Sequence, residues 1–207
     1  MAISTYSELL AAIADWAARP GLLSSVTPDF VTMTEALFNY GDEGIDFEPV
    51  RCRQMETTAS FTVTTAAVAV PSGFLEAKRL TAATSPVREL TYAEPGWYKE
   101  AYPSGQNADS PSFYTVEGTN ILSVANFEMV YYTAVPDLAT NSTNWLLTAS
   151  PNAYLFGGLL YYSIYQKDDE EAQRYLKMVR GAVRGLQRSD NASRAGRFEK
   201  RSSGSAW

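Results

Sequence analysis

The sequence predicts an α+β protein, in which a small helical bundle of two N-terminal and two C-terminal helices carries an inserted small antiparallel β-sheet domain and an extended C-terminal tail. Apolar residues recur at helical spacing near both ends of the chain, whereas the middle follows the two-residue period of strands. The last residues cannot bury enough surface to order themselves, because they are mostly small, polar or charged. The predicted domains are a helical bundle of residues 1–49 and 139–188, a β-sheet insertion of residues 50–138, and a flexible basic arm of residues 189–207.

Length and composition allow one principal core with a small subdomain. The chain has 207 residues, of which 45% are hydrophobic and 13% aromatic. It contains no apolar run long enough to cross a bilayer, and its first residues lack the charge and apolar core of a signal peptide. We therefore expect a soluble protein that is not secreted and has no membrane partner.

The absence of histidine narrows the possible chemistry. It excludes Ser-His-Asp and Cys-His nucleophiles, histidine metal ligands and the usual general base near neutral pH. The single cysteine, Cys52, can form neither an intramolecular disulfide nor a thiolate cluster by itself. The acidic stretch 42–46 lacks the ligand spacing of a calcium loop. The sequence therefore predicts no enzyme, no catalytic residue, no metal site and no cofactor.

Two N-terminal helices are predicted from capping signals and apolar spacing. Thr5 and Glu8 form a capping-box pattern, and the helix they start should end near residues 19–21. Thr27 is the expected N-cap of the second helix, which should end at Gly41. The apolar face expected for this second helix consists of Phe30, Met33, Leu37 and Tyr40.

The central segment is predicted to form strands. These are residues 59–70, 77–81, 127–133 and a hairpin of 113–116 with 121–124. Residues 94–112 contain three prolines and two glycines without a periodic pattern, and are predicted to form a long loop. Because interfaces are enriched in Trp and Tyr, we interpret this loop as a contact for a tail protein or neighbour. The alternative is that its aromatic side chains pack on the sheet of this chain. The expected contact residues, which look exposed, are Trp97, Tyr98 and Tyr102.

The C-terminal helices are marked by prolines and acidic caps. Thr143 should cap a short turn, Ser150 with Pro151 should start the main helix, and Asp168 with Glu171 should cap the last helix. Trp145 is expected to be buried where the short turn meets the main helix. The expected structural core in this region consists of Trp145, Leu146, Tyr154, Leu155 and Leu159.

Charge is distributed unevenly along the chain. Residues 174–207 hold nine basic and two acidic side chains, a net charge of +7, which leaves −13 for the remainder because the total is −6. Such asymmetry indicates an interaction tail that binds an acidic protein surface or nucleic acid.

The order and spacing of several motifs resemble one known family. The motifs are TYSEL at 5–9, PDF at 28–30, VPSGFLE at 70–76, YYTAVPDL at 131–138, NWLL at 144–147 and AYLFGGLL at 153–160. Together they resemble the head-to-tail adaptor proteins of tailed bacteriophages, also called connector or head-completion proteins. The resemblance implies a structural virion protein in the phage neck that is present in the host cytoplasm during assembly.

The resemblance also implies partners. It implies a ring of about twelve copies beneath the portal protein, with a downstream neck or tail protein on the other side. DNA would pass through this ring without sequence-specific binding. The C-terminal arm would bind the portal, and the residues expected to do so are Arg194, Arg197, Phe198, Lys200, Arg201 and Trp207.

Two other functions remain open at this stage. The basic C-terminal segment is compatible with a nucleic-acid-binding protein, although it offers few aromatic residues for base stacking. The dense cluster of carboxylates at residues 168–171 is compatible with a hydrolase, although helix capping explains that cluster more simply.

Overall fold

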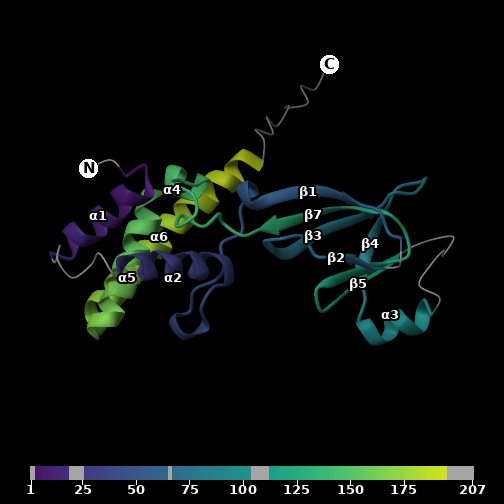
Figure 1. The fold of residues 1–207 in the computed structure, drawn as a ribbon, viewed down its shortest axis with the longest axis horizontal. Helices are drawn as coiled ribbons and strands as arrows, with labels where there is room; N and C mark the ends of the chain where they lie inside the picture. The colour runs from purple at the N-terminus through teal and green to yellow at the C-terminus, as the bar shows by residue number, and fades with distance from the viewer. Residues whose placement is uncertain (1–2, 19–25, 65–66, 104–111, 195–207) are drawn as a thin grey trace, which may run out of the picture. The chain divides into compact units, whose positions relative to one another are not determined.

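The computed structural model describes residues 3–18, 26–64, 67–103 and 112–194 (Figure 1). The chain forms two compact units. The helical unit comprises Met1–Arg53 and Val135–Trp207, and the sheet unit comprises Gln54–Ala134. The boundaries predicted from the sequence were residues 49 and 138.

The helical unit is built around one central helix. Helix α5 packs against α1, α2, α4 and α6. Half of its residues are buried, and two consecutive glycines allow its neighbours to approach. A Cβ on Gly157 would collide with Thr34 of α2, and a Cβ on Gly158 would collide with Ile13 of α1. The helices of this unit are α1 (Tyr6–Trp16), α2 (Thr27–Tyr40), α4 (Trp145–Ala149), α5 (Pro151–Gln166) and α6 (Asp169–Arg194).

Several predicted helix starts are confirmed. The capping box of Thr5 and Glu8 is present, and the Asp168 side chain accepts a hydrogen bond from the Glu171 N–H at 3.1 Å. Pro151 occupies the first turn of α5. Helix α1 ends at Trp16, earlier than the proline at position 20 suggested.

Two predicted caps are wrong by one residue. Helix α2 has Val26 at its N-cap position, without a side-chain hydrogen bond, and Thr27 is a buried helical residue. Helix α4 is capped by Asn144 instead of Thr143, because the Asn144 side-chain oxygen accepts from the Leu147 N–H at 2.8 Å.

The buried face of α2 also differs from the predicted one. Phe30 and Leu37 are buried, but Met33 is 49% and Tyr40 71% exposed. The apolar positions cover more than one side of this helix, and the side that includes Thr34 packs on α5. On the other side, the described residues leave the side chains of Met33 and Tyr40 exposed.

Helix α6 extends farther than the sequence suggested. It is 26 residues long and reaches Arg194, so the first residues of the predicted flexible arm are helical. The remainder of the arm, residues 195–207, lies outside the described residues. Leu176, Val179 and Val183 are buried, as expected of its apolar face. Among the described helices, none has the length and apolar character that crossing a membrane would require.

The sheet unit contains a seven-stranded mixed sheet with the order β1-β7-β3-β4-β5-β6-β2. The β4–β5 pair is parallel and the other pairs are antiparallel, so the expectation of a purely antiparallel sheet is wrong. The predicted strand 59–70 is two strands, and the strand at 88–92 was not predicted. The strands are β1 (Glu56–Phe61), β2 (Ala67–Ala69), β3 (Phe74–Ala82), β4 (Arg88–Tyr92), β5 (Phe113–Glu117), β6 (Asn120–Ser123) and β7 (Phe127–Thr133).

The sheet is curled, as Figure 1 shows. Strands β1 and β2 lie at its two edges, yet only the short segment from Phe61 to Ala67 joins them, with a reach of about 20 Å. Seven strands laid flat would separate the edges by about 29 Å. One face carries the core of this unit, which consists of Leu80, Ala82, Leu90, Ile121, Phe127, Met129 and Tyr131.

Near β5 and β6, a short helix packs on the opposite face. Leu122 neighbours Ile121 on β6 and therefore points to the other side of the sheet, where it packs near Tyr98 of α3 (Pro95–Ala101). The predicted loop 94–112 is thus wrong for residues 95–101, which are helical with a proline in the first turn. Two short 3-10 turns, Glu43–Ile45 and Arg53–Met55, complete the described elements.

Candidate interaction surfaces

A buried polar network fixes the chain where it enters the second half of the helical unit. Glu35 of α2 is 6% exposed, and its Oε1 accepts hydrogen bonds from the Leu138 N–H at 3.0 Å and the Tyr154 hydroxyl at 3.3 Å. The Asn39 side-chain oxygen accepts from the Val135 N–H at 2.9 Å. Residues 135–138 therefore have backbone groups bound by side chains of α2.

Asn144 extends this network to α5. Its Nδ2 donates to the Pro136 carbonyl at 2.7 Å and to the Tyr154 hydroxyl at 2.7 Å, while its Oδ1 caps α4. Tyr154 is fully buried, and its ring packs edge-on against Phe38 with centroids 5.5 Å apart. The polar groups of this region are therefore paired inside an aromatic core, which favours a single arrangement of the segment.

The environment of Glu35 alters its protonation. Burial raises the pKa of the Glu35 carboxyl to about 7, the hydrogen bond from Leu138 opposes that rise, and the neighbouring Asp137 carboxylate adds to it. With a pKa of about 7, the Glu35 carboxyl gains or loses its proton near neutral pH. The two groups that donate hydrogen bonds to it, the Leu138 N–H and the Tyr154 hydroxyl, both lie in the protein interior.

A second buried carboxylate, that of Asp190, binds the chain at Arg53, where it leaves the helical unit for the sheet unit. Asp190, near the end of α6, is 5% exposed, and its Oδ2 accepts from the Arg53 N–H at 3.0 Å. The Arg53 Nε lies 3.8 Å from its Oδ1. The segment after α2 is further held by Arg51, whose Nη1 donates to the carbonyls of Asn39 at 3.1 Å and Val50 at 2.8 Å.

The exposed side of α6 is basic. Arg174 pairs with Glu171 of the same helix at 3.1 Å, and Arg180 pairs with Asp46 at 3.3 Å. The other cations of this helix whose side chains the structure describes have no ion pair or side-chain hydrogen bond with the described residues. These are Lys177, Arg184 and Arg188, all of which are exposed.

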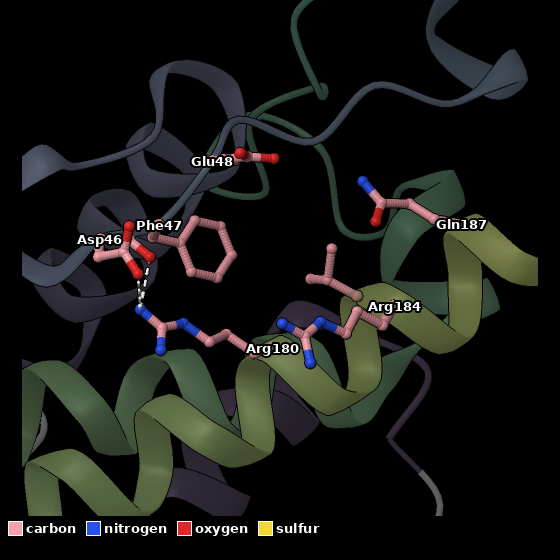
Figure 2. Close-up of a pocket in the computed structure, with 7 residues that line it drawn as sticks. Asp46, Phe47, Glu48, Arg180, Arg184 and Gln187 are labelled. Atoms are coloured by element: carbon pink, nitrogen blue, oxygen red, sulfur yellow. Dashed lines mark hydrogen bonds and ion pairs between the residues drawn. The ribbon is translucent and has the colours of Figure 1, made fainter.

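A pocket of about 220 Å³ lies between α6 and the loop after α2 (Figure 2). Figure 2 shows Arg180 extending to Asp46, where its guanidinium also donates to the carbonyls of Ile45 and Asp46. Arg180 therefore anchors the loop, which leaves Arg184 and Gln187 at the α6 wall of the pocket. Carboxylates and guanidinium groups both line this pocket. The guanidinium of Arg180 is already bound by Ile45 and Asp46 of the chain's own loop.

The aromatic side chains of α3 differ in exposure. Trp97 is 47% exposed and packs edge-on against Phe113 with centroids 4.8 Å apart. Tyr98 is only 2% exposed, so the expectation that it is an exposed contact residue is wrong. Its ring lies 5.0 Å from that of Tyr102, which is partly buried, and burial raises the pKa of Tyr98 to about 12. Trp97 alone of the three offers a largely open aromatic surface.

The expected core around α4 and α5 requires one correction. Leu146, Tyr154 and Leu159 are fully buried and Leu155 is 4% exposed, but Trp145 is only partly buried. The helix turns Trp145 toward the surface because the next two residues, Leu146 and Leu147, fill the interior side.

The carboxylate cluster at the start of α6 behaves as a helix cap. Asp168 binds the Glu171 N–H, and Glu171 pairs with Arg174. Among the residues placed by the structure, no group of three or more acidic, cysteine or histidine side chains is arranged to hold a metal ion.

The comparison with known families supports one of the interpretations of the sequence. The SU10 adaptor protein family matches the chain over residues 4–199, nearly its full length. The chain belongs to this family. It is a family of bacteriophage head-to-tail adaptors, which confirms the resemblance found in the sequence motifs. No curated protein sequence matches the chain significantly.

The portal contacts expected of this adaptor lie at the edge of the structure or outside it. Arg194 is the last residue of α6, and its side chain is not described. The other five expected residues lie outside the described residues: Arg197, Phe198, Lys200, Arg201 and Trp207.

The buried polar residues of the adaptor were not predicted from its sequence. Glu35, Asn39 and Asp190 occupy helical positions, where polar residues usually face solvent. Their partners lie far along the chain, as between Asp190 and Arg53. The one available signal was Asn144, since Asn just before an apolar turn is a favoured N-cap.

Proposed function

We propose that this adaptor forms a ring beneath the portal protein, joins the capsid to the tail and surrounds the channel through which DNA passes. The family match over residues 4–199 carries this proposal. In this role the protein is a structural component of the virion neck, assembled from subunits in the host cytoplasm, and has no catalytic activity. The ring contains about twelve copies.

The C-terminal arm is the proposed portal contact. Helix α6 carries the chain to Arg194, and the residues that follow are rich in basic side chains with Phe198 and Trp207 as aromatic anchors. Arginine forms paired hydrogen bonds with carboxylates, and buried aromatic side chains dominate many interfaces. Trp97 is the proposed contact with the downstream neck or tail protein, since it is the exposed aromatic residue of α3.

Removal of residues 195–207 tests the arm. The truncated protein should keep its thermal unfolding transition and lose binding to purified portal at physiological salt. Alanine at Trp97 is the matched control, because it alters the sheet unit and should leave portal binding intact. Unchanged portal affinity after truncation would place the docking surface elsewhere.

A ring beneath the portal is tested by imaging. Heads assembled with the adaptor should show an additional ring of density below the portal, and heads that lack it should end at the portal. The absence of such a ring on adaptor-loaded heads would overturn the proposed function.

The alternative function is nucleic-acid binding. It is favoured by Lys177, Arg184 and Arg188, which lie on one exposed side of α6. If these residues bind phosphates, DNA retention by the purified protein should fall steeply as salt rises. A protein that elutes from DNA at low salt would exclude this alternative.

A further inference from the structure

Helix α2 presents an outer face that no part of the described chain covers. Asp29, Met33, Ala36 and Tyr40 are exposed and recur at helical spacing, so they line one side of the helix opposite the side that packs on α5. Helix α2 contains no basic residue. The exposed acidic residues Asp42 and Glu43 continue this face beyond the C-terminus of the helix. We call these six residues the α2 outer face.

Helix α6 presents a second outer face of opposite charge. Lys177, Arg184 and Arg188 lie along one side of this helix with Gly181 and Gly185 among them, and all five are exposed. The distance along the helix from Lys177 to Arg188 is about 17 Å, the same as from Asp29 to Tyr40 on α2. We call these five residues the α6 outer face.

The glycines of α6 indicate what this face contacts. A glycine inside a helix is less favourable than alanine, so it calls for a packing reason. Gly157 and Gly158 of α5 have one, because a Cβ there would collide with α2 or α1. A Cβ on Gly181 or Gly185 would meet open space within the described chain. Glycine at these positions allows the backbone of another helix to approach closely. Binding of DNA phosphates needs no glycine, because long Arg and Lys side chains reach the phosphates from the helix surface.

The two outer faces belong to different helices of one unit. Both α2 and α6 pack their inner sides on α5, so their outer sides point away from that shared helix. Two different complementary patches on one protein produce a head-to-tail contact that repeats from copy to copy, and closes into a ring where the rotation permits.

We propose that adjacent copies of this chain associate through these patches, with the α2 outer face of one copy against the α6 outer face of the next. In this contact, Met33 and Tyr40 of one copy pack on the backbone at Gly181 and Gly185 of the next. The acidic residues of α2 and its following loop pair with the cations of α6. This interface rests on the proposed ring and names the surfaces that form it. The partner is a second copy, because this chain itself carries both complementary faces.

Disulfide trapping tests the contact on adaptor-loaded heads and on the free full-length chain at high concentration. The variant Met33→Cys with Gly185→Cys should give, under mild oxidation, a ladder of dimers, trimers and larger species. A mixture of the two single-cysteine variants should stop at dimers. The matched control is Met33→Cys with Gly96→Cys, since Gly96 is also exposed but belongs to the sheet unit. The native Cys52 is fully buried and should give no ladder in the unmodified chain.

Charge reversal tests the same contact without cysteines. One variant carries Lys177→Glu, Arg184→Glu and Arg188→Glu. The other carries Asp29→Lys, Asp42→Lys and Glu43→Lys. Each variant alone should fail to form rings on heads, while an equal mixture should restore them, because every contact then pairs opposite charges. Failure of the mixture to restore rings would overturn the inference, as would the absence of the ladder where rings form.

The outcome for the inference is distinguishable from that for the proposed function. Rings seen beneath the portal without the Met33–Gly185 ladder would mean that copies meet through other surfaces, which overturns the inference and leaves the proposed function intact. Heads without any ring would overturn the proposed function itself. If reversal at α6 leaves the rings unchanged but abolishes salt-sensitive DNA retention, DNA occupies the α6 outer face and the inference fails.

Discussion

The backbone N–H of Arg53 donates a hydrogen bond to the carboxylate of Asp190 across 137 positions of sequence, at 3.0 Å. Arg53 is the last residue of the helical unit before the sheet unit begins, and Asp190 lies in the last turns of α6, close to the proposed portal arm. The segment that leaves the helical unit is therefore tied to the helix that leads into the arm. On the return path, Glu35 and Asn39 hold residues 135–138 in a comparable way.

Replacing Asp190 by alanine should destabilise the helical unit. The change leaves the Arg53 N–H without this acceptor, at a cost of about 1–3 kcal/mol. Asp190→Asn retains an acceptor oxygen and should recover most of the loss. Urea unfolding of both variants measures the effect, with alanine at the exposed Glu48 as control. A loss in Asp190→Ala no larger than that of the control would show that the contact contributes little.

The periodic parts of this fold were predictable, and its polar interior was not. The capping box of α1 and the strand 127–133 follow from local sequence, because both depend on neighbouring residues. Helix α3 has proline and glycine at its start, and its helical state depends on Tyr98 packing in the sheet unit. The burial of Glu35 depends on Leu138 and Tyr154, which the sequence does not place beside it.

The candidate surfaces show the same division. The spacing of the cations in the sequence predicted the basic side of α6. It did not show which of these cations form ion pairs within the chain. Arg180 is bound by a loop 134 residues earlier in the chain. The exposure of Met33 and Tyr40 could not be predicted either, since apolar residues at helical spacing ordinarily indicate a buried face.

Alanine substitutions of helical glycines should have opposite signs on α5 and α6. At Gly157 the new Cβ would collide with Thr34, whose own Cβ would lie only 3.2 Å from it, so unfolding free energy should fall by about 1–3 kcal/mol. At Gly181 the Cβ meets open space, so helix propensity should raise stability by up to about 1 kcal/mol. Thermal unfolding of the two variants checks this, and a loss at Gly181 in the isolated chain would contradict it.

Truncation of Trp145 should cost less than truncation of its neighbour Leu146. Leu146 is fully buried, so its change to alanine should cost about 2–5 kcal/mol. Trp145 is only partly buried and keeps part of its ring in water in the folded state, so Trp145→Ala should cost about 1–2 kcal/mol. Denaturant unfolding ranks the two variants. A larger loss for Trp145 would mean that its buried part carries more of the packing than its exposure indicates.

Glu35 should make the helical unit less stable as pH rises toward neutrality. Its folded-state pKa is about 7, above the ordinary value of 4.5, so the folded state binds its proton more tightly than the unfolded state does. That stabilisation is complete below about pH 4.5 and is lost as pH rises through about 7. Glu35→Gln keeps an oxygen that can accept from Leu138 and Tyr154 but does not titrate. Unfolding free energies between pH 4.5 and 8 should therefore fall by about 1–3 kcal/mol more in the native protein than in this variant. Equal slopes for the native protein and the Glu35→Gln variant would contradict this prediction.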